Sequence, residues 1–160
     1  MKLPVLFVCE DNGLAIHTPA EARHGYKSIA DIIAKFDCAV FSDESATDVG
    51  RIHDMTKEAA ASIHKTGKPA FMHFRYFRYL EHVGINEDFS AGYRSAKELE
   101  KWIAKDPIKL QRARLLDAGV IEKMIASLEK KIDAQIAASI ERAKSAPFPN
   151  AKELYEDIYA

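Results

Sequence analysis

The sequence predicts an α/β protein with a parallel, doubly wound sheet followed by a helical tail. Three short apolar runs, at 5–9, 38–42 and 68–76, have the length and composition of strands. Helical patterns separate these runs, and this alternation is typical of a parallel sheet. The runs lack strict alternation of apolar and polar residues, as expected when helices cover both faces of a sheet.

Both helices between the strands carry recognisable start or stop signals. The first is expected over 28–36, with Ser28 as its N-cap. Either Thr47 or Asp48 caps the second helix, which ends at Gly67.

Two parts of unequal character follow from this pattern. Residues 1–94 are expected to form the α/β part, and residues 95–160 a helical region that packs on it. The segment 77–94 has no clear period, and loops of this length are usually functional or disordered. Its mixture of aromatic, basic and acidic residues favours an ordered functional loop.

The helical region has its own local signals. Ser95 and Glu98 have the spacing of a capping box, and Pro107 opens a helix that ends at Gly119. A last short helix is expected over 151–159. Between them lies a long amphipathic helix, which predicts packing on the sheet domain or on a partner subunit. Its apolar residues repeat at spacings of three and four: Ile121, Ile125, Leu128, Ile132, Ile136 and Ile140.

Composition narrows the class of protein. The 160 residues, 48% of them hydrophobic, are enough for one domain with a core. A net charge of −1 gives no electrostatic footprint for nucleic acid or an anionic membrane. No apolar stretch approaches the ~20 residues of a membrane-spanning helix, and no signal-peptide pattern is present. Cys9 and Cys38 suit reduced thiols in a cytoplasmic protein better than a disulfide or a metal pair.

The segment 9–19 follows the first predicted strand directly. Open α/β sheets place ligand chemistry at the carboxyl ends of their strands. Asn12 offers a neutral oxygen and the turn offers backbone carbonyls, which are ligands that Mg²⁺ accepts when phosphates complete its shell. An ordinary Asp-Asn-Gly turn that ends a strand explains the same residues, and spacing alone favours that interpretation.

The segment 3–16 also resembles part of a known motif. It is similar to the end of the thiamin-diphosphate motif in the α subunit of the decarboxylating dehydrogenase component of 2-oxo acid dehydrogenase complexes, with the related acetoin dehydrogenases. That family typically reads Pro-Val-(Ile/Leu)-Phe-Val-Cys-Glu-Asn-Asn-Gly-Tyr-Ala-Ile here. This chain has Asp11 for the first Asn and Leu14 for the Tyr. Family-like segments recur in the same order at 93–95, 105–108 and 153–160.

The resemblance implies a fold, two cofactors and a set of site residues. The fold would be the C-terminal half of the thiamin-diphosphate-binding fold, and the cofactors thiamin diphosphate and Mg²⁺. Asn12 matches the family's magnesium ligand, and the backbone carbonyl of Leu14 matches a second one. Gly13 and Ala15 complete the cofactor-binding turn.

The family's Gly-Asp-Gly element, which supplies another magnesium ligand, has no counterpart in residues 1–160. The resemblance therefore covers only the C-terminal half of the family's α subunit. This leaves two expectations open: the chain is an excised domain, or it is a natural piece that needs its N-terminal half from a partner.

A histidine is the candidate catalytic residue. The family's strand Tyr-Arg-Tyr, matched here by residues 74–76, precedes a loop whose histidine lies over the cofactor. The usual His-Gly-His-Ser is replaced by Leu80-Glu81-His82-Val83-Gly84, so the resemblance assigns that role to His82. A histidine can donate a proton to a developing alkoxide or contact a diphosphate. The alternative is a loop histidine without a role. His17 is a weaker candidate.

Two arginines near this loop have two interpretations. Arg75 and Arg78 could bind phosphate or an acidic cluster. They could equally pair with an acidic residue of the loop, for which the sequence offers Glu81, Glu87 and Asp88.

The resemblance implies decarboxylation of a 2-oxo acid, or cleavage of a related ketone, with acyl transfer to an acceptor such as a lipoyl group. It implies a β subunit as partner in an α₂β₂ heterotetramer, and a lipoyl-bearing acyltransferase as a possible further partner. The alternative is a non-catalytic assembly or oligomerisation module that is inactive without its N-terminal half.

Overall fold

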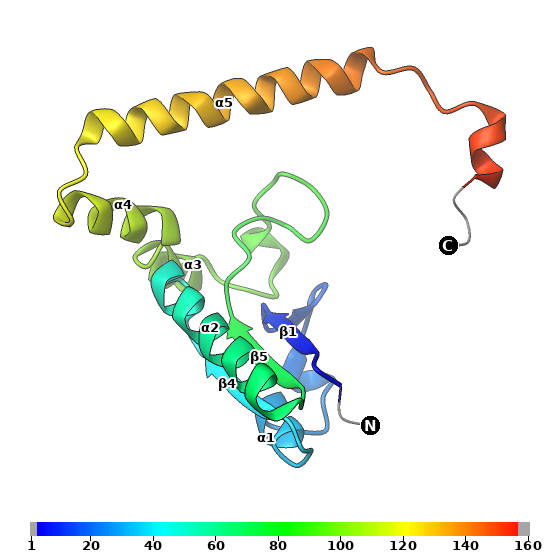
Figure 1. Cartoon of the computed structure of the whole chain (residues 1–160), viewed down its shortest axis with the longest axis vertical. Helices are drawn as coiled ribbons and strands as arrows, with labels where there is room; N and C mark the ends of the chain where they lie inside the picture. Colours follow the sequence, from blue (N-terminus) through cyan, green and yellow to red (C-terminus); the bar gives the residue numbers. More distant parts are fainter. Residues whose placement is uncertain (1–2, 157–160) are drawn as a thin grey trace. The chain divides into compact units, whose positions relative to one another are not determined.

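The computed structural model describes residues 3–156 and divides into two compact units, Met1–Ala113 and Arg114–Ala160 (Figure 1). The first unit contains a parallel sheet with helices, and the described part of the second is helical. The predicted α/β class is therefore confirmed.

Three parallel strands form the main sheet. They are β1 (Leu6–Asp11), β4 (Ala39–Asp43) and β5 (Ala70–Arg75), in the order β1-β5-β4. Leu6 and Ala39 both pair with Ala70, so all three strands end at one edge of the sheet. Because β5 is central, its side chains are almost all buried. This topology puts the segments that follow β1 and β5 side by side.

Local signals account for the two helices between the strands. Helix α1 (Ile29–Ile33) is shorter than expected, but Ser28 caps it as predicted. Helix α2 (Val49–Thr66) begins after Asp48, whose carboxylate accepts a backbone hydrogen bond from the first turn. Gly67 ends α2 with a φ of 66° in the left-handed region, which glycine adopts without strain.

The core of the first unit lies between α2 and the sheet (Figure 1). Its buried members are Ala59, Ile63, Ala70, Met72 and Phe74. Small residues on α2 let the helix lie close to β5, where Met72 is the one large described side chain that is fully buried.

A small hairpin follows β1 and was not predicted. It pairs β2 (Leu14–Ala15) with β3 (Thr18–Pro19) and leads into a 3₁₀-helix, η1 (Ala20–Ala22). Ile16 adopts a φ of 60° at its tip. This hairpin lies at the carboxyl end of the sheet.

The loop after β5 contains a short 3₁₀-helix, η2 (Phe89–Ala91), and ends at α3 (Ala96–Ile103). Ser95 occupies the N-cap position of α3, but its side chain makes no capping hydrogen bond. The predicted capping box with Glu98 is therefore wrong. Instead, the Ser95 carbonyl accepts from the Glu98 backbone N–H at 3.1 Å.

Helix α4 (Pro107–Asp117) begins at Pro107 as predicted, with the Asp106 carboxylate accepting from two backbone N–H groups of its first turn. The bond from the Tyr79 hydroxyl to Asp106, 3.2 Å long, links the loop to this helix start.

The second unit contains the predicted long helix, α5 (Glu122–Ser145). Of its apolar stripe, Ile125 is buried and the members from Leu128 onward are exposed. The last helix is a 3₁₀-helix, η3 (Ala151–Tyr155), and the rest of the helix expected over 151–159 lies outside the described residues. Within residues 3–156, no helix combines the length and apolarity needed to cross a membrane.

Candidate functional site

The turn after β1 is built from two successive side-chain-to-backbone hydrogen bonds. Asp11 Oδ1 accepts from the Gly13 N–H at 2.7 Å, and Asn12 Oδ1 accepts from the Leu14 N–H at 2.8 Å. Short polar side chains favour turns because they replace a backbone acceptor in this way. The interpretation of Asp-Asn-Gly as turn chemistry is confirmed, and the same bonds fix the amide oxygen of Asn12 beside the Leu14 backbone.

Asp11 also ties this turn to the neighbouring strand. Its Oδ2 accepts from His73 Nε2 at 3.1 Å and from Arg75 Nη1 at 2.9 Å. Partial burial would raise the pKa of Asp11, but the hydrogen bonds from Arg75, the Gly13 N–H and His73, with the charge of Arg75, outweigh it and lower that pKa. Both oxygens of Asp11 are therefore bonded. The lowered pKa means that Asp11 holds the turn as an ionised carboxylate.

Gly13 is required by this packing. Its φ is 73°, and a Cβ at this position would lie 2.9 Å from Nη2 of Arg75. The turn therefore combines a left-handed backbone with close approach of a guanidinium group, and both conditions favour glycine.

A cleft of about 480 Å³, the large cleft, opens at the carboxyl end of β1 and β5. Asn12, Leu14 and the Asp11 ion pair line it, together with Cys9. Burial and then the charge of Asp11 raise the pKa of the Cys9 thiol, so this free cysteine is protonated at neutral pH. His73 is buried as expected of a core histidine, but its Nδ1 has no hydrogen-bond partner among the described residues.

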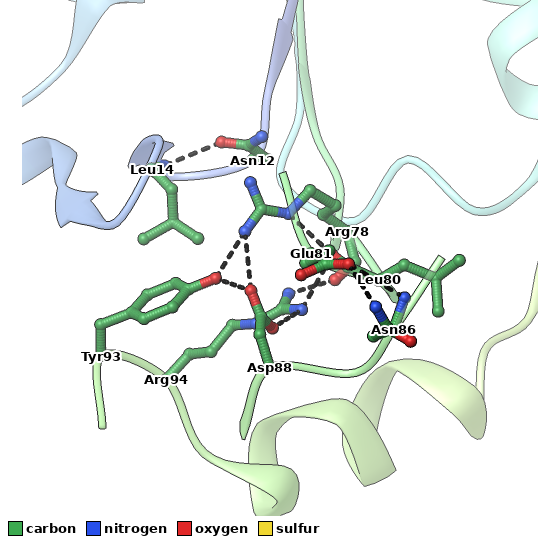
Figure 2. A network of polar contacts seen from close by, with 9 residues as sticks. All are labelled: Asn12, Leu14, Arg78, Leu80, Glu81, Asn86, Asp88, Tyr93 and Arg94. Carbon is green, nitrogen blue, oxygen red and sulfur yellow. Dashed lines mark hydrogen bonds and ion pairs between the residues drawn. The ribbon is translucent and has the colours of Figure 1, made fainter. Parts of the chain in front are cut away.

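The loop between β5 and α3 is held together by a second carboxylate, that of Asp88. Asp88 bonds Arg78, Tyr93 and Arg94, and we call these four residues the Asp88 cluster (Figure 2). The distance from Arg94 Nε to Asp88 Oδ1 is 2.7 Å, and Arg94 Nη2 donates to the Leu80 carbonyl at 2.9 Å. Of the three acidic residues offered as partners of Arg78, the structure selects Asp88. Glu81 instead accepts from Asn86.

Aromatic rings pack against the guanidinium group of Arg94 in the Asp88 cluster. Arg94 Cζ lies 4.6 Å from the ring centroid of Phe89 and 5.3 Å from that of Phe77. The Phe77 ring also stacks against Trp102 of α3. Only 3% of the Arg94 side chain is exposed, so its charge is stabilised by the ring faces as well as by Asp88.

A second cleft of about 180 Å³, the small cleft, lies between the turn and the Asp88 cluster. Asn12, Gly13 and Leu14 line it from one segment, and Arg78 and Tyr93 from the other. Figure 2 shows the Arg78 guanidinium between the Asn12 turn and Asp88. The Arg78 Nη1 atom is buried and has no hydrogen-bond partner among the described residues.

These groups suit a cation bound together with an anion. The Asn12 amide oxygen and the Leu14 carbonyl are hard, neutral donors of the kind Mg²⁺ takes. The unpartnered N–H of Arg78 suits a phosphate oxygen. Both signs of charge line the small cleft, because Glu21 and Glu98 accompany its arginines.

The structure brings together some of the sequence-predicted residues and not others. Asn12, Gly13, Leu14 and Ala15 form one continuous turn. His82 is exposed, and it lines neither the large nor the small cleft.

His17, the weaker candidate, stacks on Tyr93 of the Asp88 cluster with ring centroids 4.7 Å apart. From the sequence, Asp11 was only part of a turn and Asp88 only one of three possible partners of the loop arginines. The signals for Asp11 were its place at the end of a strand and its departure from the family's Asn.

Fold and site together define an α/β protein with a polar, oxygen-rich turn at the carboxyl edge of a parallel sheet. The profile of the family described as "Dehydrogenase E1 component" matches residues 1–152. The chain belongs to this family.

Three relatives illustrate the match. The α subunit of acetoin:2,6-dichlorophenolindophenol oxidoreductase from Cupriavidus necator is 29% identical, and the alignment covers 99% of this chain and 47% of that subunit. The pyruvate dehydrogenase E1 component α subunit of Rickettsia conorii is 25% identical, with coverages of 98% and 47%. The human mitochondrial 2-oxoisovalerate dehydrogenase α subunit is 28% identical, with coverages of 99% and 36%. The chain thus spans less than half the length of these relatives.

Gly13→Ala tests the close packing of the turn. We expect a loss of about 1–2 kcal/mol in the free energy of unfolding, because a Cβ is strained at positive φ and displaces the Arg75 guanidinium. Urea denaturation measures the loss. Gly25→Ala is the matched control, since its Cβ would meet no atom within 4 Å. Equal stability of the two variants would contradict the packing argument.

Asp11→Asn tests the ion pair through its pH dependence. A lowered pKa in the folded state stabilises the protein above the unfolded value of about 3.9, and this contribution is lost as pH falls through the folded pKa. We expect the variant to be less stable than the wild type by about 1–2 kcal/mol at pH 7, with the gap closing below about pH 4. Urea unfolding across that range, with the exposed Asp54→Asn as control, measures it. A gap that is independent of pH would refute the assignment.

Asp88→Ala tests the loop closure. Removing the carboxylate leaves two largely buried guanidinium groups without their ion pair, at a cost of about 3 kcal/mol. We expect faster proteolysis within 77–94 and a lower urea midpoint. Glu87→Ala changes the neighbouring, exposed carboxylate and should leave both unchanged. If the two variants behave alike, the Asp88 cluster does not hold the loop.

Proposed function

We propose that this chain supplies the magnesium- and diphosphate-binding half of a thiamin-diphosphate site in a 2-oxo acid dehydrogenase or a related ketone-cleaving enzyme. The observation that carries the proposal is the small cleft, which Asn12, Leu14 and Arg78 line together. Nη1 of Arg78 is buried and has no hydrogen-bond partner among the described residues. Family membership supports the choice of this cofactor over other phosphate compounds.

Asn12 and Leu14 are the proposed metal ligands, through the amide oxygen and the backbone carbonyl. The hydrogen bond from the Leu14 N–H orients the Asn12 side chain and leaves one lone pair of its oxygen for the cation. Gly13 lets the backbone of the turn come close to a diphosphate, and Ala15 continues the turn into β2. Further ligands would come from the diphosphate, from water and from a partner.

Bound thiamin diphosphate supplies the electron sink for cleavage next to a carbonyl group. The protein's part is to orient it and to place charged groups around the substrate. We propose that His82 moves a proton at the substrate oxygen or contacts the diphosphate. Its exposed position on the loop requires that the loop closes over the ligand.

Membership of the family supports two further proposed partners, a β subunit and an acyl acceptor. We propose a β subunit in an α₂β₂ assembly, with an acyl acceptor such as the lipoyl group of an acyltransferase. The relatives' names support the range of substrates, since they include acetoin, pyruvate and 2-oxoisovalerate. The two free cysteines support the cytoplasm as the place of action.

A non-catalytic assembly module is the second candidate. The exposed apolar stripe of α5 favours it, because such a surface is typical of a contact with another chain.

Calorimetric titration separates these functions. Thiamin diphosphate with Mg²⁺ is titrated into the chain alone, and then into a fusion that carries upstream the N-terminal part of the Cupriavidus necator subunit that this chain does not match. We expect magnesium-dependent binding by the fusion only. Absence of binding by both proteins would favour the assembly module.

Asn12→Ala in that fusion tests the ligand assignment. Loss of one oxygen ligand should weaken magnesium-dependent binding by at least about tenfold, which corresponds to about 1.4 kcal/mol. Asn12→Asp keeps an oxygen at the same place and should bind more tightly than Asn12→Ala. Asn150→Ala, far along the chain, should bind as the unmodified fusion does. Unchanged affinity in Asn12→Ala would refute the assignment.

A further inference from the structure

Residues 81–86, which we call the tip, form the part of the loop between β5 and α3 that carries His82. The two end residues of the tip bond each other (Figure 2). The Glu81 carboxylate accepts from Asn86 twice, from its backbone N–H at 3.2 Å and from its side-chain Nδ2 at 2.8 Å. In the other direction, the Glu81 N–H donates to the Asn86 carbonyl at 2.9 Å. These hydrogen bonds close the tip into a ring.

Gly84, between the two ends, makes room for the Glu81 carboxylate. Its φ is 137°, and a Cβ at this position would overlap Oε1 of Glu81. Glycine is the residue that combines this backbone conformation with such a close approach. The Glu81 carboxylate therefore lies across the inside of the tip, against the Gly84 backbone and Asn86.

Burial of apolar side chains does not hold the tip in shape. The side chains that follow Glu81 point into solvent, since Val83 is 83% exposed and Ile85 is 86% exposed. His82 is exposed as well. Hydrogen bonds to a carboxylate are stronger than those between neutral groups. The conformation of the tip therefore depends on the bonds that Glu81 makes.

Both ends of the tip are fixed to the Asp88 cluster. Before the tip, the Leu80 carbonyl accepts from Arg78 Nε and from Arg94 Nη2, each at 2.9 Å. After the tip, Asp88 follows Asn86 by two residues. Arg78 and Arg94 also line the small cleft, where Nη1 of Arg78 is the buried atom without a partner among the described residues. A diphosphate that is bound there would lie beside the support of the tip.

The structure assigns to Glu81 the role of a positioning residue. Its carboxylate closes the tip and so holds the backbone of His82 in one conformation, ready for contact with the diphosphate. This rests on the proposed function, which it deepens by naming the residue that prepares His82 for that contact. A segment that is ordered before its ligand arrives loses less conformational entropy on binding. Closure of the loop then moves the tip as one unit.

NMR relaxation of the ¹⁵N-labelled full chain tests the rigidity of the tip without any ligand. We expect backbone order parameters of about 0.8 at 82–85 in the wild type, and values below about 0.6 in Glu81→Ala. Glu81→Gln keeps an oxygen acceptor at the same place and should restore the order. Gly84→Ala should loosen the tip although Glu81 is present, because its Cβ displaces the carboxylate. Glu87→Ala, which changes an exposed neighbouring carboxylate, is the matched control and should leave the order unchanged.

The link between Glu81 and His82 is measured by calorimetry in the fusion described above, with thiamin diphosphate and Mg²⁺ as the probe. His82→Ala and Glu81→Ala should each weaken binding at least about threefold, and Glu81→Gln should restore most of the affinity that Glu81→Ala loses. The double variant Glu81→Ala/His82→Ala should bind no more weakly than His82→Ala. A positioning residue has no further effect once the residue that it positions is gone, whereas a purely structural role would give additive losses.

Several results would overturn this role of Glu81. Order parameters at 82–85 that are as low in the wild type as in Glu81→Ala would do so, and so would a rigid tip in Glu81→Ala. Additive losses in the fusion, unchanged binding in His82→Ala, or a loss that Glu81→Gln does not restore would show that Glu81 does not act through His82. Absence of binding by the unmodified fusion would overturn the proposed function, while the relaxation of the full chain would still decide whether Glu81 closes the tip.

Discussion

The carboxylate of Asp11 is the interaction on which the candidate site depends. Parallel register places Asp11 opposite Arg75 and Cys9 opposite His73. The two-residue period of a strand then puts Asp11, His73 and Arg75 on one face of the sheet. Because one carboxylate oxygen, Oδ2, is bonded to both His73 and Arg75, the other is free to accept from the Gly13 N–H. The position of Asn12 follows from that bond.

The loop side of the small cleft is held by interactions within the loop and not by the sheet. The Asp88 cluster joins residues close in sequence, so its formation costs little loop-closure entropy. Its burial needs the stacked rings of Phe77, Phe89 and Trp102, which belong to the loop and to α3. The turn thus depends on the sheet, and the loop on its own aromatic support. The cleft lies where these two structures meet, and there Nη1 of Arg78 has no partner among the described residues.

Local signals in the sequence predicted the main strands and helices, but not the hairpin after β1 and not the contacts between elements. Ser28, Asp48 and Gly67 act within one helical turn. The predicted roles of Ser28 and Gly67 are confirmed, and of the two candidate caps, Thr47 and Asp48, the structure selects Asp48. The capping box of Ser95 failed although its backbone has the extended conformation of an N-cap, since spacing does not fix the direction of the hydroxyl. The class of sheet was predictable, and the doubly wound fold stays a prediction.

The contacts of the site residues also divide into local ones, which could be predicted, and long-range ones, which could not. The turn formed by Asp11 and Asn12 uses neighbours in sequence and could be predicted. The bond from Asp11 to His73 joins residues 62 positions apart, and it requires the strand register before it can be seen. The choice of Asp88 over Glu81 as partner of Arg78 depended on the path of the loop, which has no period to predict it.

The proposed ligand contacts both this chain and a partner, and this has an energetic consequence. A ligand that contacts both this chain and a docked partner binds only the joined form, so it stabilises the joint by RT ln(1 + [L]/Kd). By reciprocity, the partner raises the ligand affinity by the same factor that the ligand raises the partner's. In the proposed site Asn12 would contact the ligand in both forms, so the groups that the partner contributes would give the ligand its preference for the joined form. Association with the partner and loading of the site would therefore be one coupled equilibrium.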